Sequence, residues 1–256
     1  YGDGYNKNPD EENSIYGIHA VEELLEKRLL SVDHIYFNKD CKNPEIFNLM
    51  KICRKERLSY NLVPEFKLNS LAKTTKHQGV VAFCSIKQYC STEELYEIAQ
   101  SKKNALFLIP ASVEDPQNLG AIIRSCTAFG VDGIILERKH TAPLNAAVSK
   151  SSAGMVEHIC IARPKNLEKI VGDFKTQGFC VVGAEVSKGE MPQDLNLSGP
   201  TILVLGGEHR SIPPYLSKLC THFVSIPISS STQSLNVSAA TAVLLYESAK
   251  QRNFSY

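Results

Sequence analysis

Residues 226–247 read IPISSSTQSLNVSAATAVLLYE, and this stretch joins a strand to the last helix of the chain. A serine-rich polar run separates the strand end at Pro227 from apolar residues that recur at helical spacing from Val237 onward. We predict Ser234 as the helix N-cap, because its hydroxyl can accept a hydrogen bond from a free amide of the first turn. The stretch would then present backbone amides at the positive end of a helix, where polar ligands bind, although an ordinary strand–loop–helix connection fits equally well.

Two earlier stretches combine with this one into a family signature. Residues 115–130 read DPQNLGAIIRSCTAFG, and residues 203–212 read LVLGGEHRSI. In this order the three stretches resemble motifs 1, 2 and 3 of the SpoU (TrmH-like) RNA 2′-O-methyltransferases of the SPOUT superfamily. Motif 1 is matched by Asn118, Gly120 and Arg124, and motif 3 by Ser234, Leu235, Asn236, Ser238 and Ala240. The resemblance extends over nearly the whole chain.

The expected fold class is α/β. Strands and helices alternate from Ala105 to the C-terminus, which indicates a mostly parallel sheet covered by helices. This pattern alone would predict an unknotted, doubly wound sheet. The resemblance implies instead a SPOUT domain with a deep trefoil knot, in which the loops after Gly183, Leu205 and Ile226 meet and hold S-adenosylmethionine.

The sequence divides into four segments. Residues 1–13 are rich in Asn, Asp, Glu and Gly and are expected to form a disordered lead-in. Residues 14–87 form a small α/β unit, which resembles the L30e-like substrate-binding domain found before the catalytic domain in one branch of the family. Residues 88–104 are predicted as a linker that lets the two domains reorient, and residues 105–256 as the methyltransferase domain.

Composition gives few further constraints. The 256 residues carry 28 basic and 27 acidic side chains, so the overall charge provides no argument for nucleic acid. The eight cysteines show neither C-x-x-C pairs nor zinc-finger spacing, and we expect free thiols in a reducing compartment and no metal. No apolar run is long enough to span a bilayer. The expected location is the bacterial cytoplasm or, in a eukaryote, an organelle matrix.

Methyl transfer from a sulfonium to a ribose 2′-OH requires alignment of the two reactants and help in removing the hydroxyl proton. Arg124 is the residue we expect at the acceptor; because its pKa exceeds 12, it would orient and stabilise the developing alkoxide rather than act as a base. The alternative is a helix arginine that pairs with a carboxylate. The resemblance implies five catalytic residues: Arg124, Asn118, Glu208, Ser234 and Asn236.

The cofactor site is also given by the resemblance. Its expected residues are Gly183, Leu205, Gly206, Gly207, Ile226, Ser234 and Leu235. His209, Ser211 and Ser230 stand where the family motifs usually carry glycine, which leaves open a noncatalytic RNA-binding protein that retains the fold. A nicotinamide oxidoreductase and a G-x-S-x-G hydrolase are improbable, because neither glycine pattern is present.

The partners expected are RNA and a second copy of the chain. A helix predicted over 45–57 carries four basic side chains, which are either a solvated face or a phosphate-binding footprint: Lys51, Arg54, Lys55 and Arg57. The resemblance implies a homodimer formed through the knotted domain. It also implies a guanosine 2′-OH of large-subunit ribosomal RNA as the substrate, with transfer RNA as the alternative. His19 and His77 are expected to be structural histidines.

Overall fold

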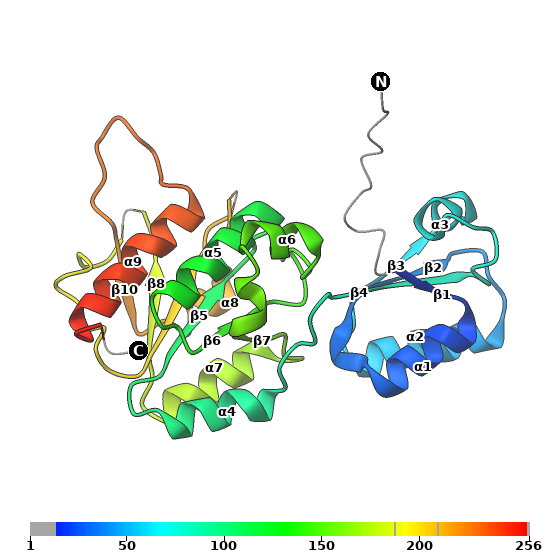
Figure 1. Ribbon diagram of the computed structural model, residues 1–256, viewed down its shortest axis with the longest axis horizontal. Helices are drawn as coiled ribbons and strands as arrows, with labels where there is room; N and C mark the ends of the chain where they lie inside the picture. Colours follow the sequence, from blue (N-terminus) through cyan, green and yellow to red (C-terminus); the bar gives the residue numbers. More distant parts are fainter. Residues whose placement is uncertain (1–13, 187, 209, 255–256) are drawn as a thin grey trace. The chain divides into compact units, whose positions relative to one another are not determined.

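The computed structural model describes residues 14–186, 188–208 and 210–254, so the expected lead-in lies outside the described residues. The chain divides into two compact units (Figure 1). One contains the chain up to Gln88 together with Pro143–Ala146, and the other contains Tyr89–Ala142 and everything from Ala147 onward. Each unit has its own sheet and its own apolar core.

The first unit is a four-stranded sheet with helices on both faces. The strand order is β1-β4-β2-β3, antiparallel except for the parallel pair β2–β3. Alternate residues of β2 and β4 pack against α1 and α2 on one face and against α3 on the other. The bounds are β1 Ser14–Tyr16, α1 Ile18–Lys27, η2 Leu29–Ser31, β2 Val32–Asn38, α2 Pro44–Lys55, β3 Tyr60–Val63, α3 Glu65–Ala72 and β4 Val80–Cys84.

Several sequence predictions for this unit need correction. The first helix begins at Ile18, because Gly17 takes a φ of 94° and changes the chain direction between β1 and α1. Helix α3 was not predicted. His77 is a structural histidine, since its Nδ1 accepts from the Gly79 amide at 3.0 Å, whereas His19 is exposed on α1 and the structural expectation was wrong for it.

The second unit is built on a six-stranded sheet in which all neighbouring strands are parallel, in the order β10-β8-β9-β5-β6-β7. This confirms the α/β class with a mostly parallel sheet; the knot itself stays a prediction. Strand β5 is buried along its whole length, as expected for a central strand covered on both faces. The strands are β5 Leu106–Pro110, β6 Gly133–Ile135, β7 Cys160–Ala162, β8 Cys180–Ala184, β9 Thr201–Leu205 and β10 His222–Val224.

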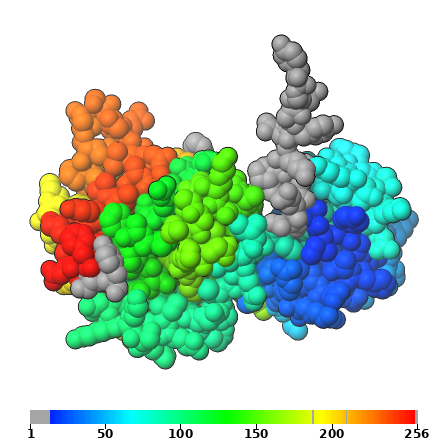
Figure 2. All heavy atoms as spheres, in the orientation of Figure 1, coloured from blue at the N-terminus to red at the C-terminus, as the bar shows by residue number. Residues whose placement is uncertain are grey.

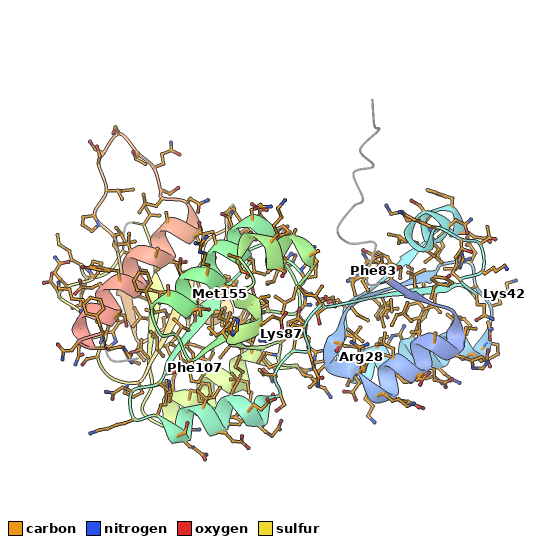
Figure 3. All side chains as sticks on the ribbon, in the orientation of Figure 1. Arg28, Lys42, Phe83, Lys87, Phe107 and Met155 are labelled. Carbon is orange, nitrogen blue, oxygen red and sulfur yellow. The ribbon has the colours of Figure 1, made fainter. Side chains whose placement is uncertain are left out.

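Helices cover both faces of this sheet (Figure 1). Helices α4, α7 and α8 contribute to one aromatic core, in which the rings of Phe107 and Phe174 stack 5.1 Å apart; Figure 3 labels Phe107 inside the unit. Helices α5 and α9 pack against each other. The bounds are α4 Thr92–Ser101, α5 Pro116–Ala128, α6 Ala146–Ser151, η3 Met155–His158, α7 Leu167–Thr176, α8 Pro214–Ser217 and α9 Val237–Gln251.

Most of the predicted linker 88–104 is folded and belongs to the second unit. Helix α4 begins with a capping box formed by Ser91 and Glu94. Its Leu95 is fully buried in the core, and the Cys90 amide donates to the carbonyl of Ile161 at 2.8 Å. The second unit therefore begins at Tyr89, before the residue 105 expected as the start of the methyltransferase domain, because α4 packs on the core of this unit. Reorientation of the two units stays a prediction.

Two expectations from composition can be compared with the structure. All eight cysteines are free, as predicted. Among the helices of the described residues, none has the length and apolar character needed to cross a membrane.

Gly120 allows close packing of α5 against the end of α6, and this gives a stability prediction. A Cβ at Gly120 would overlap the Ser151 hydroxyl and lie 2.9 Å from the amide nitrogen of Ser152. Gly120→Ala should therefore lower the free energy of unfolding by about 1–3 kcal/mol, the usual cost of overpacking. The matched control is Gly172→Ala in α7, where a Cβ meets nothing within 4 Å.

Because alanine is the better helix former, Gly172→Ala should raise the free energy of unfolding by about 0.5–1 kcal/mol. Urea denaturation of both variants, followed by far-UV circular dichroism, measures the two changes. Equal effects of the two substitutions would contradict the close approach of α5 and α6.

Candidate active site

A pocket of about 450 Å³ lies at the carboxyl ends of β8, β9 and β10. The sequence stretches that line it are far apart in the chain: 184–186 after β8, 205–208 and 210–211 after β9, and 224–228 with 234–240 around the connection to α9. The convergence of these three loops was predicted, and the structure confirms it. Part of that connection, the serine-rich loop, projects from the second unit and is drawn in orange in Figures 1 and 2.

A chain of side-chain hydrogen bonds beside the pocket joins the three motifs. Asn236 Nδ2 donates to Asn118 Oδ1 at 3.0 Å, and Asn118 Nδ2 donates to Glu208 Oε1 at 2.9 Å. The three residues come from the start of α9, the start of α5 and the loop after β9. Since each amide is fixed by both of its polar atoms, the chain holds the three motif segments in one arrangement.

Asn236, and not Ser234, is the N-cap of α9. Its Oδ1 accepts from the Ser238 amide at 2.8 Å and from the Ala239 amide at 3.4 Å. The cap must directly precede the first helical residue, and the helix begins at Val237, so Ser234 lies too early to cap it. Asn236 therefore both caps α9 and orients Asn118. Ser234 is an exposed residue of the pocket lining.

Glu208 accepts hydrogen bonds from the motif 1 segment. Its carboxylate accepts from the backbone amides of Glu114 and Asp115, both at 3.3 Å, and from the side chain of Asn118. Partial burial acts to raise the pKa of Glu208, but the hydrogen bonds from Asn118 and from backbone amides outweigh it and hold this pKa below its usual range. Glu208 is therefore an ionised brace for the loop that precedes α5.

Two glycines make this arrangement of loops possible. A Cβ on Gly206 would lie 2.8 Å from the carbonyl oxygen of Arg210, where the loop folds back. A Cβ on Gly207 would collide with the carbonyl of Ser112 in the loop after β5. The close approach at Gly206 is thus backbone against backbone within motif 2, and Gly207 allows the approach of this loop to the segment before motif 1.

The cofactor residues expected from the sequence can now be located. Six of the seven line the pocket: Leu205, Gly206, Gly207, Ile226, Ser234 and Leu235. Gly183 does not line it, because it lies within β8 and faces Cys220 and Phe223. Sequence reasoning missed other lining residues, among them Glu185, Arg210 and Ile228. The available signal was their position in the loops that follow β8, β9 and β10.

The three departures from the family glycines lie in different surroundings. Ser211 lines the pocket. Ser230 lies in the exposed serine-rich loop, where the hydroxyls of its neighbours Ser229 and Ser231 form a hydrogen bond of 2.9 Å. His209 lies outside the described residues.

Arg124 is not part of the polar chain. Six residues separate it from Asn118, which corresponds to a rotation of about 600° and leaves the two side chains about 120° apart around α5. Arg124 is exposed, and its side chain makes no hydrogen bond or ion pair with another described residue. The alternative of a carboxylate partner is therefore not seen in the described part of the chain. Arg124 also does not line the pocket.

The basic residues of the first unit form part of one helix face. Lys51, Arg54 and Lys55 are exposed on α2, and Arg54 Nε donates to the Tyr60 hydroxyl at 3.0 Å. Arg57 follows the end of the helix with a φ of 53°, so it does not extend the helical face as predicted. Among the described residues, no group of three or more His, Cys, Asp or Glu side chains is placed to hold a metal ion.

Comparison with known proteins gives two family matches. The model of the SpoU rRNA Methylase family matches residues 105–246, and the model named RNA 2′-O ribose methyltransferase substrate binding matches residues 14–90. YacO of Bacillus subtilis (strain 168), named as a TrmH family tRNA/rRNA methyltransferase, is 33% identical over 240 residues, 93% of this chain and 96% of that protein. A protein with the same family name from Staphylococcus aureus (strain COL) is 30% identical over 95% of this chain and 98% of its own.

Solved structures give the same result for the fold. The SpoU methyltransferase AviRb from Streptomyces viridochromogenes in complex with AdoMet has a TM-score of 0.57 at 22% identity, and covers 94% of this chain and 91% of its own. An AdoMet-bound rRNA methyltransferase from Sinorhizobium meliloti has a TM-score of 0.59 at 22% identity, with 93% and 87% covered. The A. aeolicus TrmH/SpoU tRNA modifying enzyme has a TM-score of 0.54 at 26% identity, with 64% and 83% covered. The chain therefore belongs to the SpoU methylase family and is an S-adenosylmethionine-dependent RNA methyltransferase of the TrmH/SpoU type.

Proposed function

We propose that the protein methylates the 2′-OH of a guanosine in large-subunit ribosomal RNA. The observation that carries the ribose assignment is the polar chain from Asn236 through Asn118 to Glu208 beside the pocket. We assign these neutral amides and the tightly held carboxylate to the acceptor side, because such groups suit the positioning of a hydroxyl. The match of residues 14–90 to a 2′-O ribose methyltransferase substrate-binding model supports the same reaction.

The pocket suits S-adenosylmethionine in volume and in the chemistry of its lining. Its volume of about 450 Å³ lies in the usual range for a ligand of this size. Leu235 and Ile226 offer apolar contacts and backbone polar groups for a purine. Gly206 also lines the pocket and has no side chain of its own. The cofactor supplies the methyl group on a sulfonium, and the residues of the chain hold it and orient the acceptor.

We propose that the site is completed by a second copy of the chain. Arg124 is exposed on α5 and has no partner among the described residues of its own copy. The neighbouring α9 exposes Val243 at 44% and Tyr246 at 52%, which gives this side of the unit an apolar surface suited to a two-fold contact. In such a dimer, Arg124 of one copy would lie at the acceptor side of the other copy's pocket.

Ribosomal RNA is favoured over transfer RNA by the first unit. The solved protein titled as a tRNA modifying enzyme covers 64% of this chain, whereas the one titled as an rRNA methyltransferase covers 93%. The additional coverage supports a role for the substrate-binding unit in holding a large folded RNA. Transfer RNA is the second candidate, because the names of the curated relatives include both RNAs.

An acceptor competition tests this choice of substrate. The full chain is incubated with methyl-labelled S-adenosylmethionine and equimolar large-subunit rRNA and total tRNA, and the label in each RNA is counted. We expect label in the rRNA at a guanosine. Label confined to tRNA would overturn the substrate assignment, and cofactor binding without label in either RNA would favour the noncatalytic RNA-binding alternative.

The basic face of α2 gives a prediction for RNA binding. Reversing Arg54 and Lys55 to glutamate should weaken rRNA binding at least tenfold at low salt, because each phosphate contact contributes through counterion release. The slope of log K against log salt should fall by about one to two. Filter binding at several salt concentrations measures both quantities.

The matched control reverses two exposed lysines elsewhere in the same unit, Lys67 on α3 and Lys76 after it. Helices α2 and α3 cover opposite faces of the sheet, so the control changes the same net charge away from the α2 face. We expect the control pair to retain RNA affinity. If both pairs weaken binding equally, the α2 face is not the footprint.

A further inference from the structure

The carboxylate of Glu137 connects two loops of the active site from outside the three motifs. Glu137 follows β6, and its Oε2 accepts from the Ser112 amide at 2.8 Å. Its Oε1 accepts a hydrogen bond from the Tyr215 hydroxyl. Ser112 lies in the loop between β5 and α5, and Tyr215 lies on α8, just after the motif 2 loop. One side chain therefore bridges the segments that carry motif 1 and motif 2.

The Ser112 end of this bridge lies directly beside the loop after β9, which carries Glu208. Ser112 is buried and has a φ of 56°, in the left-handed region that a serine adopts at an energetic cost. Its carbonyl faces Gly207, and the next residues include Glu114 and Asp115, whose amides hold the carboxylate of Glu208. A change at the Ser112 amide therefore reaches Glu208 through a short stretch of backbone.

The other contacts hold Glu137 in place. Arg163 Nε donates to the Glu137 carbonyl at 3.1 Å, and its Nη2 donates to the carbonyl of Arg138 at 3.1 Å, so the chain after β6 is held by the chain after β7. Burial, followed by the hydrogen bond to Glu137 and the charge of that residue, raises the pKa of Tyr215 well above its usual range. The Tyr215 hydroxyl is therefore a permanent donor at working pH.

We propose that Glu137 is a positioning residue for methyl transfer, which fixes the Ser112 loop so that Glu208 and Asn118 are held in their catalytic arrangement. This inference rests on the proposed function for its kinetic test. Glu137 does not line the pocket and touches neither reactant site, so it acts through the backbone of the loop. Its effect therefore falls on turnover rather than on the affinity for cofactor.

Three substitutions in the full chain test the role. Glu137→Ala removes both acceptors and should lower kcat roughly tenfold to a hundredfold with little change in cofactor Kd. Glu137→Gln retains both contacts, because its carbonyl can accept from Ser112 and its amide can donate to the Tyr215 oxygen; it should restore kcat to within a few-fold of wild type. Tyr215→Phe removes only the hydrogen bond from the tyrosine hydroxyl to Glu137, so it should lower kcat by less than Glu137→Ala.

The matched control is Tyr96→Phe. Tyr96 donates to the Asp173 carboxylate at 2.6 Å and joins α4 to α7, so it breaks a tyrosine–carboxylate bond of the same kind away from the pocket. We expect it to leave kcat unchanged. If Tyr96→Phe and Tyr215→Phe lower kcat equally, or if Glu137→Ala lowers the melting temperature while kcat stays at the wild-type value, Glu137 is a stabilising residue only.

Hydrogen exchange at the Ser112 amide separates this inference from the proposed function. In the wild type this amide should exchange slowly, and Glu137→Ala should remove its protection while Glu137→Gln retains it. If the Ser112 amide stays protected in Glu137→Ala, the proposed positioning role of Glu137 is wrong, whatever the substrate is. If protection is lost in Glu137→Ala but the protein methylates no RNA, the Glu137–Ser112 contact is supported and the proposed function is wrong. If Glu137→Ala fails to fold, the kcat values of Glu137→Gln and Tyr215→Phe decide the same question. A kcat near wild type in Glu137→Gln and a lowered kcat in Tyr215→Phe support the role of Glu137, whereas wild-type kcat in Tyr215→Phe contradicts it.

Discussion

Replacing Arg124 by alanine should reduce turnover on the order of 10²–10⁴-fold, the range that a positioned acceptor-side group contributes. Folding and cofactor affinity should stay at their wild-type values, because Arg124 is exposed and outside both the pocket and the polar chain. Single-turnover methylation, thermal unfolding and calorimetry with S-adenosylmethionine measure the three quantities. Lys169→Ala, which removes an exposed positive charge from α7, is the matched control and should leave turnover unchanged.

Arg124 also tests the proposed dimer. Mixing Arg124→Ala with a cofactor-deficient variant, Gly206→Gln, should restore activity if Arg124 acts on the other copy's pocket. After subunit exchange, heterodimers with one complete site each would give roughly a quarter of wild-type activity for a statistical two-fold mixture. A mixture as inactive as its components would contradict this arrangement, and so would a protein that sediments only as a monomer.

Glu208→Gln should lower kcat/KM on the order of 10²-fold. The glutamine has one acceptor oxygen, and its amide group would point donors at the donors of Asn118 and of the loop backbone. The side chain of Asn118 is half-buried, and a donor there that loses its acceptor costs up to about 1–3 kcal/mol, which is enough to move the loop. Retention of most activity in Glu208→Gln would contradict the role of the carboxylate as a brace.

The pH dependence of this brace has a defined sign. Because the folded-state pKa of Glu208 is lowered, its contribution to stability is fully present above the pKa of the unfolded chain. The contribution is lost as the pH falls through the lowered folded-state pKa. The free energy of unfolding, measured from neutral pH down through the ordinary glutamate range, should therefore fall more steeply with decreasing pH in wild type than in Glu208→Gln.

The sequence was sufficient to predict the fold class and the place of the pocket. The three motifs are local patterns, and each follows the end of a strand of the parallel sheet, so the strands bring them to one edge of the sheet. Leu205, Ile226 and Leu235 were placed correctly for this reason. Gly183 was not, because a strand residue and the next one face opposite sides, and the pocket begins at Ala184.

The interactions that lock the site could not be read from local pattern. Asn236 was expected to be a catalytic residue, but its role as the cap of α9 depends on where the helix begins, and helix boundaries are the least certain part of such predictions. Glu137 and Tyr215 are 78 residues apart and belong to no motif, so only the folded chain shows that they meet. Helix α4 was taken as part of a linker because its polar face dominates the composition.

The most direct test of the central claim is the position of the transferred methyl group. The full-length protein is incubated with methyl-labelled S-adenosylmethionine and large-subunit rRNA, and the RNA is digested to nucleosides and analysed by mass spectrometry. We take the polar chain of Asn236, Asn118 and Glu208 beside the pocket to predict the label on the ribose. The guanosine, and hence 2′-O-methylguanosine as the product, is expected from the family resemblance alone. Label on a base, or no incorporation at saturating cofactor, would contradict it.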